Sequence, residues 1–223
     1  MPTLATRELR ELTRGRTTLV QHGSRLRQSL RGLLARWGQA VGAGDLLGKA
    51  AQKKLAAVEL PPAARTLLEL SLHVLKTIEA AAQELETELV RASQVHPLAP
   101  TLLTLPGVGA VTAMSLLAEI GEVKRFANGR QLCAYSGLVP SVHQSGGRSH
   151  TGPLTKRGNA WLRTTAVQAA NKQMRIKADS ELRRCYYRHA IRLGANPAKV
   201  ATARKFLHVV HSLLMRPRPF VRR

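Results

Sequence analysis

The sequence predicts an all-α protein, in which a helical, coiled-coil arm precedes a compact basic helical domain. Aromatic residues make up only 4% of the chain while alanine and leucine are abundant, a composition that favours helix over sheet. Leucines recur at helical spacing over long segments that glycine and proline clusters separate. Hydrophobic residues account for 44% of the chain, enough for a packed core.

Residues 1–60 predict a basic helical arm. Leucines from Leu9 to Leu34 follow a roughly helical spacing with arginines between them. This pattern predicts an amphipathic helix from Arg7 to about Trp37. Four glycines in "GQAVGAGDLLGKA" then predict a bend or loop.

Residues 61–96 predict a second long helix, because Pro61 and Pro62 suit a first helical turn. Apolar residues recur in it every seven positions, with a second set three positions later. The two sets are Leu68, Leu75, Ala82 and Leu89, and Ser71, Ile78 and Leu85. This pattern predicts a coiled coil that pairs two copies of the chain. A helical hairpin with the first helix inside one chain explains it equally well.

Residues 97–223 predict a compact C-terminal domain, because "HPLAP" ends the preceding helix. Asn196 and Pro197 predict the N-cap and first position of its last helix. A polar loop separates the third helix from the fourth. The expected helices are Thr101–Thr104, Ala110–Ile120, Gly129–Tyr135, Asn159–Ile176, Ser180–Leu193 and Pro197–Met215.

The charge of the chain predicts a nucleic-acid partner, first of all DNA. The net charge is +22, of which residues 124–223 carry +19 with only two acidic residues. Such a surface repels itself unless phosphates lie near. No apolar run is long enough to span a membrane, and no basic stretch has the bulky apolar anchors of a membrane-surface helix. Two cysteines without a CxxC pair and the lack of a secretion signal indicate a cytoplasmic, nucleoid-associated protein.

The stretch "LLTLPGVGAVTAMSLLAEIG" predicts a helix-hairpin-helix element. Gly107 and Gly109 would let the backbone approach a DNA phosphate, whose charge would meet amides at the N-terminus of the second helix. A turn packed in the core is the alternative explanation.

The loop "GLVPSVHQSGGRSHTGPLTKRGN" raises the question of chemistry. The sequence has no Asp or Glu between Val123 and Ala178, so this region predicts no metal site. It offers instead the hydroxyl of Ser145, followed by the cations Arg148, Lys156, Arg157 and Arg163. A serine needs a base or strong electrostatic help to act as a nucleophile. The residues alone therefore favour a loop that contacts DNA phosphate over one that attacks it.

The segment from Leu103 to Ala170 resembles the C-terminal transposase domain of the IS110/IS116 insertion-sequence family, bridge-RNA-guided recombinases related to pilin-gene invertases. The shared motifs are the PGVG turn, "RFANGRQLCAYSGLVP", the "QSGG" serine and "LTKRGNAWLR". The arm is similar to the helical linker of the family. The resemblance implies that Ser145 is the nucleophile that links covalently to DNA, with guide RNA as a further partner and pairing of copies through the coiled coil.

The same resemblance implies an N-terminal RuvC-like domain whose acidic residues bind Mg²⁺, and no such segment is recognisable in this sequence. We therefore expect no cofactor in this chain, with Mg²⁺ entering only with a RuvC-like or full-length transposase partner. The predicted function is the DNA-binding, serine-bearing part of a transposase. A truncated, non-catalytic nucleic-acid-binding protein that regulates a full-length transposase is the alternative.

Overall fold

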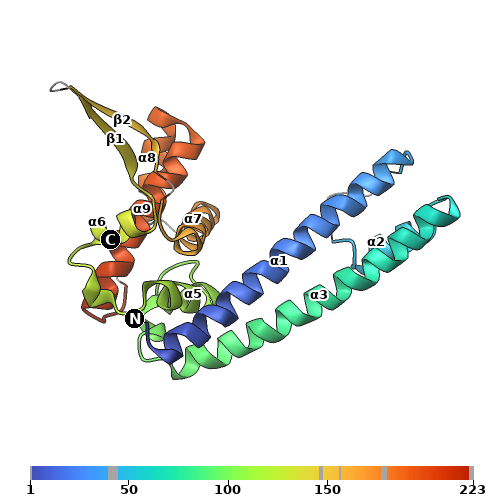
Figure 1. Cartoon of the computed structure of the whole chain (residues 1–223), viewed down its shortest axis with the longest axis horizontal. Helices are drawn as coiled ribbons and strands as arrows, with labels where there is room; N and C mark the ends of the chain where they lie inside the picture. Colours follow the sequence, from blue (N-terminus) through green and yellow to red (C-terminus); the bar gives the residue numbers. More distant parts are fainter. Residues whose placement is uncertain (1, 40–44, 146–147, 156, 177–179, 221–223) are drawn as a thin grey trace. The chain divides into compact units, whose positions relative to one another are not determined.

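The computed structural model of the chain describes residues 2–39, 45–145, 148–155, 157–176 and 180–220. It comprises two units, a compact unit of Met1–Thr13 with Leu89–Arg223 and an arm of Arg14–Glu88 (Figure 1). The domain boundaries predicted after residues 60 and 96 stay predictions.

Helices dominate the described residues, which confirms the all-α prediction. The expected helices of the C-terminal half form within a few residues of their predicted bounds. The helices are α1 Leu4–Arg36, α2 Lys49–Ala56, α3 Pro62–Val95, α4 Ala99–Leu103, α5 Ala110–Ile120, the 3-10 helix η1 Val123–Arg125, α6 Gly129–Tyr135, α7 Ala160–Arg175, α8 Glu181–Leu193 and α9 Ala195–Met215. The strands are β1 Pro140–Ser145 and β2 Arg148–Leu154.

Side-chain caps fix the starts of three helices in the compact unit. The side chain of Asn128 accepts a hydrogen bond from an amide in the first turn of α6. Asn159 does the same for α7 and Ser180 for α8. Each cap satisfies an amide that has no partner within its helix, so these helices begin where their sequence provides an oxygen.

The predicted N-cap of α9 is wrong. The cap is Gly194, and Asn196 already lies in the first turn of the helix. Gly194 has a φ of +83°, which lets the chain turn directly from α8 into α9. The carbonyl of Gly194 then accepts from the amide of Ala198 at 3.2 Å, so the helix starts before the Asn-Pro pair that was expected to open it.

In the arm, α1 and α3 pack against each other within one chain. In the ion pairs Arg16–Glu86 and Arg27–Glu79, the later residue of α1 meets the earlier residue of α3, so the two helices are antiparallel. Their core is a cluster of buried aliphatic residues that α2 completes. The cluster contains Leu30, Leu33, Leu34, Leu46, Leu55, Ala64, Leu68 and Leu75. The heptad leucines of the arm are thus buried by the intramolecular hairpin, and a coiled coil between copies stays a prediction.

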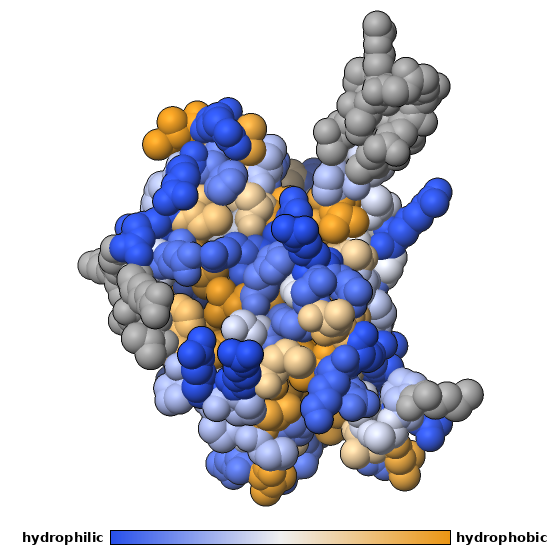
Figure 2. Space-filling view, turned by 90° about the vertical axis from the view of Figure 1, so that its left-hand side faces the viewer, coloured by the Kyte–Doolittle hydropathy of each residue, from blue (hydrophilic) through white to orange (hydrophobic). Residues whose placement is uncertain are grey.

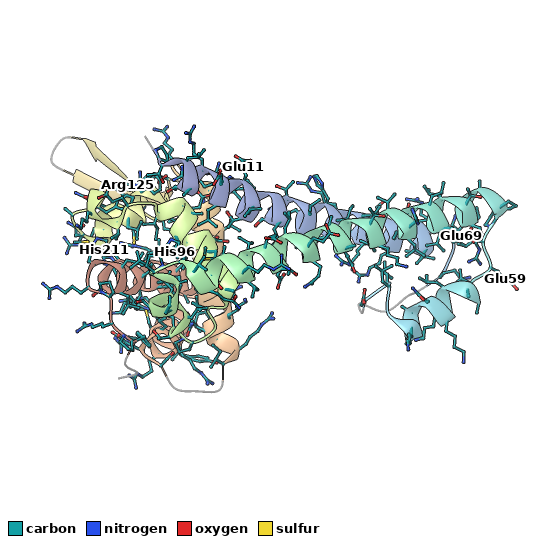
Figure 3. The ribbon with its side chains drawn as sticks, turned by 90° about the horizontal axis from the view of Figure 1, so that it is seen from below. Glu11, Glu59, Glu69, His96, Arg125 and His211 are labelled. Atoms are coloured by element: carbon teal, nitrogen blue, oxygen red, sulfur yellow. The ribbon has the colours of Figure 1, made fainter. Side chains whose placement is uncertain are left out.

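The compact unit is built around α9, which contacts α4, α6, α7 and α8. Phe206 of α9 is fully buried in the main apolar cluster. On the same helix the Nε2 of buried His211 lies 2.9 Å from the carbonyl oxygen of Phe126 (Figure 3). His211 is therefore a structural residue.

Hydrophilic residues cover most of the face shown in Figure 2, and hydrophobic ones appear only in scattered patches. No helix among the described residues is long and apolar enough to cross a lipid bilayer.

Candidate nucleic-acid interface

The segment predicted as a polar loop contains a β-hairpin. Strands β1 and β2 are antiparallel, and Pro140 at the start of β1 pairs with Leu154 at the end of β2. At the other end Ser145 pairs with Arg148, on either side of Gly146 and Gly147, which lie outside the described residues. The hairpin thus brings the backbone of the predicted nucleophile opposite that of the first predicted phosphate-binding arginine.

Main-chain hydrogen bonds close the base of the hairpin. The amide of Thr155 donates to the carbonyl of Val139 at 3.0 Å, and the amide of Asn159 donates to the carbonyl of Tyr135 at 2.7 Å. Gly158 lies between these two bonds with a φ of +125°, and a Cβ there would come within 2.4 Å of the Tyr135 carbonyl oxygen. The two ends of the hairpin segment are therefore held together just before α7 begins.

A buried carboxylate supports this base from α5. Glu119 is only 1% exposed, and its Oε2 accepts from the side-chain amide of Asn159 at 2.6 Å. The guanidinium of Arg10 lies 4.0 Å from the same oxygen. Asn159 also caps α7, so one side chain connects α5, the end of the hairpin and α7. A buried charge with such partners stabilises a local arrangement more readily than it performs chemistry.

Two residues next to Glu119 share its network. The Nε of Arg125 donates to the carbonyl of Ile120 at 3.1 Å, and its guanidinium stacks 4.5 Å from the centre of the Tyr135 ring (Figure 3). Burial alone would raise the pKa of Tyr135, but hydrogen bonds from Asn159 and Arg125 and the charges of Arg125 and Arg10 lower it. The arginines at this site thus donate hydrogen bonds to carbonyls at the end of α5, pair with the carboxylate of Glu119 and stack on the ring of Tyr135.

Sequence reasoning missed Glu119 and the role of Asn159 in its network. A signal for Glu119 existed, because it is the single charged residue in the otherwise apolar helix "AVTAMSLLAEI". A lone charge in an apolar helix is rarely fully buried without a partner. Its partner Asn159, forty residues away, could not be identified from the sequence.

The predicted DNA-binding arginines and lysine differ in exposure and in hydrogen bonding. Arg157 is exposed between the hairpin and α7. Arg163 is partly buried, and its Nη1 donates to the carbonyl of Ser136 at 3.0 Å, so it also fixes the turn that leads into the hairpin. The side chain of Arg148 and all of Lys156 lie outside what the structure describes.

The two predicted backbone-binding glycines also differ. Gly107 has a φ of +73°, and a Cβ there would come within 2.8 Å of Ile176 Cδ1 and 3.4 Å of Lys172 Cβ. It therefore serves the close packing of the turn against the end of α7. Gly109 is the N-cap of α5 and has open space where a Cβ would be. Of the two, Gly109 leaves room for a phosphate at the start of a helix, and the role of the pair in a helix-hairpin-helix element stays a prediction.

The described residues contain no group of three or more His, Cys, Asp or Glu that could hold a metal ion. Both cysteines are free, and Cys133 is buried. Burial raises the pKa of the Cys133 thiol to about 11, although the charge of Arg204 opposes this. Since the thiolate is the reactive form, Cys133 is an inert core residue at neutral pH. His208 also lies next to Arg204, and burial followed by the charges of Arg204 and Lys205 lowers its pKa.

Comparison with known proteins identifies the stretch that contains this hairpin. Residues 99–188 match the family described as "Transposase IS116/IS110/IS902 family". Over these residues the chain is similar to an IS110/IS116-family transposase domain. The matched stretch begins with α4 and ends within α8, and it includes the hairpin of Ser145 together with Glu119 and Asn159, whereas Arg10 lies outside it.

Relatives of the transposase domain extend the similarity to most of the chain. The transposase for insertion sequence element IS1111A of Coxiella burnetii is 30% identical over 222 residues, which are 96% of this chain and 60% of that protein. A probable family 20 transposase of Pseudomonas aeruginosa is 30% identical over 214 residues, or 93% of this chain and 63% of that protein. The pilin gene-inverting protein of Moraxella bovis is 44% identical over 48 residues, 22% of this chain and 15% of its own length. The chain therefore spans about three fifths of the first two relatives.

Proposed function

We propose that the chain is the DNA-binding, serine-bearing part of a transposase, and that Ser145 is its nucleophile. The observation that carries the proposal is that the transposase domain includes the hairpin in which Ser145 and Arg148 are paired. The net charge of +19 in residues 124–223 supports a polyanionic substrate.

In the proposed step, the hydroxyl oxygen of Ser145 forms a bond to a DNA phosphorus. The bond from that phosphorus to one deoxyribose oxygen breaks, and the serine proton ends on the leaving oxygen. A phosphodiester replaces a phosphodiester, so the energy of the broken bond is kept in the serine–DNA link. A hydroxyl of another DNA end can then attack the link and release the serine, which exchanges strands.

Cations near the hairpin would stabilise the extra negative charge on phosphorus as the bond forms. In this proposal Arg148, Lys156 and Arg157 supply that charge. Arg163 instead positions the hairpin, because its guanidinium donates a hydrogen bond to the carbonyl of Ser136 in the turn before β1. Gly109 offers helix-end amides to a neighbouring phosphate.

The described residues do not fit a Mg²⁺ site, because Mg²⁺ requires oxygen ligands such as carboxylates. The carboxylate nearest the hairpin base in this network, Glu119, already has Asn159 and Arg10 as partners. No step is therefore assigned to a metal in this chain. An acidic RuvC-like domain, a guide RNA and a second copy of the chain are the proposed partners. Since the heptad leucines of α3 face α1, pairing of copies would use another face of the arm.

The test is a search for a covalent protein–DNA adduct. The chain is incubated with labelled DNA that contains insertion-sequence ends, with and without a RuvC-like partner and guide RNA, and separated under denaturing conditions. We expect an adduct with the wild-type chain and none with Ser145→Ala.

Ser149→Ala is the matched control, because Ser149 lies on β2 of the same hairpin, opposite Gln144. This variant should keep the adduct. An adduct that persists in Ser145→Ala would disprove the assignment. DNA binding without any adduct under all conditions would support the non-catalytic, regulatory alternative instead.

A further inference from the structure

A cavity of about 570 Å³ lies between the base of the β-hairpin and the α8–α9 pair. Its volume is typical of pockets for small molecules, about 300–1,000 Å³. Among the described residues, neither the members of the Glu119 network nor Gly109, Arg157 or Arg163 line it. The base of the hairpin that carries Ser145 therefore has a concave site of its own.

The floor of the cavity is apolar. Pro140 and Leu154, the paired residues at the base of the hairpin, form one wall. Leu193 at the end of α8 and Val200 on α9 contribute apolar surface from the helices. Such a floor disfavours a bare phosphate, which would lose its hydration there. It suits the flat face of a nucleobase, which can lie against apolar side chains once it has left the stack.

The rim of the cavity is positively charged. Arg192 and Arg204 are both exposed and line the cavity, and none of the acidic residues that the structure describes lines it. Asn196 lies on the rim in the first turn of α9, a helix start without a side-chain cap. Cationic donors and the positive end of a helix attract phosphates. A ligand of this cavity should therefore combine an apolar ring with a negatively charged phosphate backbone.

His189 adds a hydrogen-bond acceptor to this rim. Its Nδ1 lies 2.7 Å from the carbonyl oxygen of Cys185, one helical turn earlier. A carbonyl can only accept, so Nδ1 carries a proton and Nε2 is the acceptor of the neutral ring. Base edges present both donors and acceptors, and the rim can pair with both through His189 and the arginines.

We propose that this cavity takes one unpaired nucleobase of the DNA that the chain binds. The proposal rests on the proposed function in one respect, that the bound polyanion is DNA. Pro140 lies five residues before Ser145 on β1, so the cavity is about 17 Å along the strand from the serine at about 3.3 Å per residue. That distance corresponds to about five nucleotides of a duplex strand. Binding of the base in the pocket would therefore determine which phosphate, counted along the DNA helix axis, lies at Ser145.

The experiment compares two DNA duplexes that differ by a single unpaired 2-aminopurine nucleotide. Affinity is measured by fluorescence anisotropy, and the environment of the base by the emission of 2-aminopurine. We expect the wild-type chain to bind the duplex with the unpaired base about tenfold more tightly, because that base is already free of the stack. The emission should change on binding, since the base enters a different environment.

Ala201→Phe fills the cavity, which Ala201 lines from α9. It should abolish the tenfold preference and the change in emission while binding to the paired duplex stays the same. Ala134→Phe is the matched control, since Ala134 is an exposed residue of α6 that does not line the cavity.

Arg204→Gln is the second variant, to be used if Ala201→Phe fails to fold. Its control is Arg175→Gln, since Arg175 is exposed on α7 and does not line the cavity. Arg204→Gln should reduce the preference for the unpaired base several-fold, and Arg175→Gln should leave that preference unchanged.

Equal affinity of the wild-type chain for both duplexes would overturn the pocket and leave DNA binding intact. A preference that survives in both Ala201→Phe and Arg204→Gln would overturn it as well. The matching RNA duplexes form a second arm of the experiment, and a preference seen with RNA alone would overturn the assignment to DNA. Failure to bind either DNA duplex would instead disprove the proposed function itself.

Discussion

Single glycines show how strongly one residue can constrain the site. Gly158 combines a φ of +125° with a position where a Cβ would come within 2.4 Å of the Tyr135 carbonyl oxygen. Gly107 is similarly enclosed by α7. The sequence predicted Gly107 as a glycine that lets the backbone approach a DNA phosphate. In the structure the missing side chain makes room for side chains at the end of α7 at Gly107, and for the main chain of Tyr135 at Gly158.

A pair of substitutions to alanine tests this difference. Gly158→Ala should lower the free energy of unfolding by at least about 1–3 kcal/mol, because the conformation is strained for any side chain and the backbone oxygen cannot move aside. Gly32→Ala, in the C-terminal part of α1 with no atom within 4 Å of the new Cβ, should raise it by up to about 0.5–1 kcal/mol. Thermal or urea unfolding followed by circular dichroism measures both changes. Unchanged stability in Gly158→Ala would contradict the packing at the base of the hairpin.

The helices were predictable because each has its own local signal. The sequence places Asn128, Asn159 and Ser180 where α6, α7 and α8 need a cap, and the structure uses all three side chains. The start of α9 was predicted too late because Gly194 overrides the Asn-Pro pair. Helix α2 was missed, since its eight residues follow a glycine-rich segment and bury only Leu55.

The hairpin was missed for a different reason. Its central pairs include His143 with His150 and Gln144 with Ser149, residues without strong strand propensity. A Gly-Gly pair between the two runs that form the strands was the available signal, because such pairs favour two-residue hairpin turns. The helical patterns on both sides of this segment favoured a loop between two helices over a hairpin. The cavity at the base of the hairpin could not be predicted either, because its walls come from the hairpin and from the α8–α9 pair, which the whole of α7 separates in the sequence.

Within the arm, the hairpin of α1 and α3 depends on a buried leucine stripe. Leu75→Ala should destabilise the arm by about 2–5 kcal/mol, because Leu75 is 0% exposed and its loss leaves a cavity. Leu70→Ala, on the same helix but 62% exposed, should cost less than about 0.5 kcal/mol. Urea unfolding of the two variants beside the wild type separates the effects. A large loss in Leu70→Ala would show that a second copy or another partner covers this outer face.

At the scale of the whole molecule, positive charge is distributed unequally along the chain. Residues 1–123 carry 14 basic and 11 acidic residues, whereas residues 124–223 carry 21 and 2. Ion pairs within the arm use its acids, as in Arg16–Glu86. The second part has only Asp179 and Glu181, and Glu181 already pairs with Lys205 at 2.7 Å, so most of its basic residues have no acid to pair with and their charge is available to a polyanion. The sequence predicted this division fully, because charge counts need no structure.

The salt dependence of DNA binding tests whether that charge is the binding surface. Each phosphate contact releases counterions, so the affinity should fall by about 10³-fold or more between about 50 and 200 mM salt if six or more phosphates are contacted. Arg157→Gln, in the basic part, should reduce the slope of log affinity against log salt by about one. Arg25→Gln, on the exposed side of α1 in the arm, removes the same charge and should leave the slope unchanged. Titrations of a labelled duplex at four or five salt concentrations give all three slopes. If the slope falls equally in both variants, the arm also contacts DNA phosphates. If the affinity of the wild type does not depend on salt, neutralisation of phosphates is not the source of the affinity.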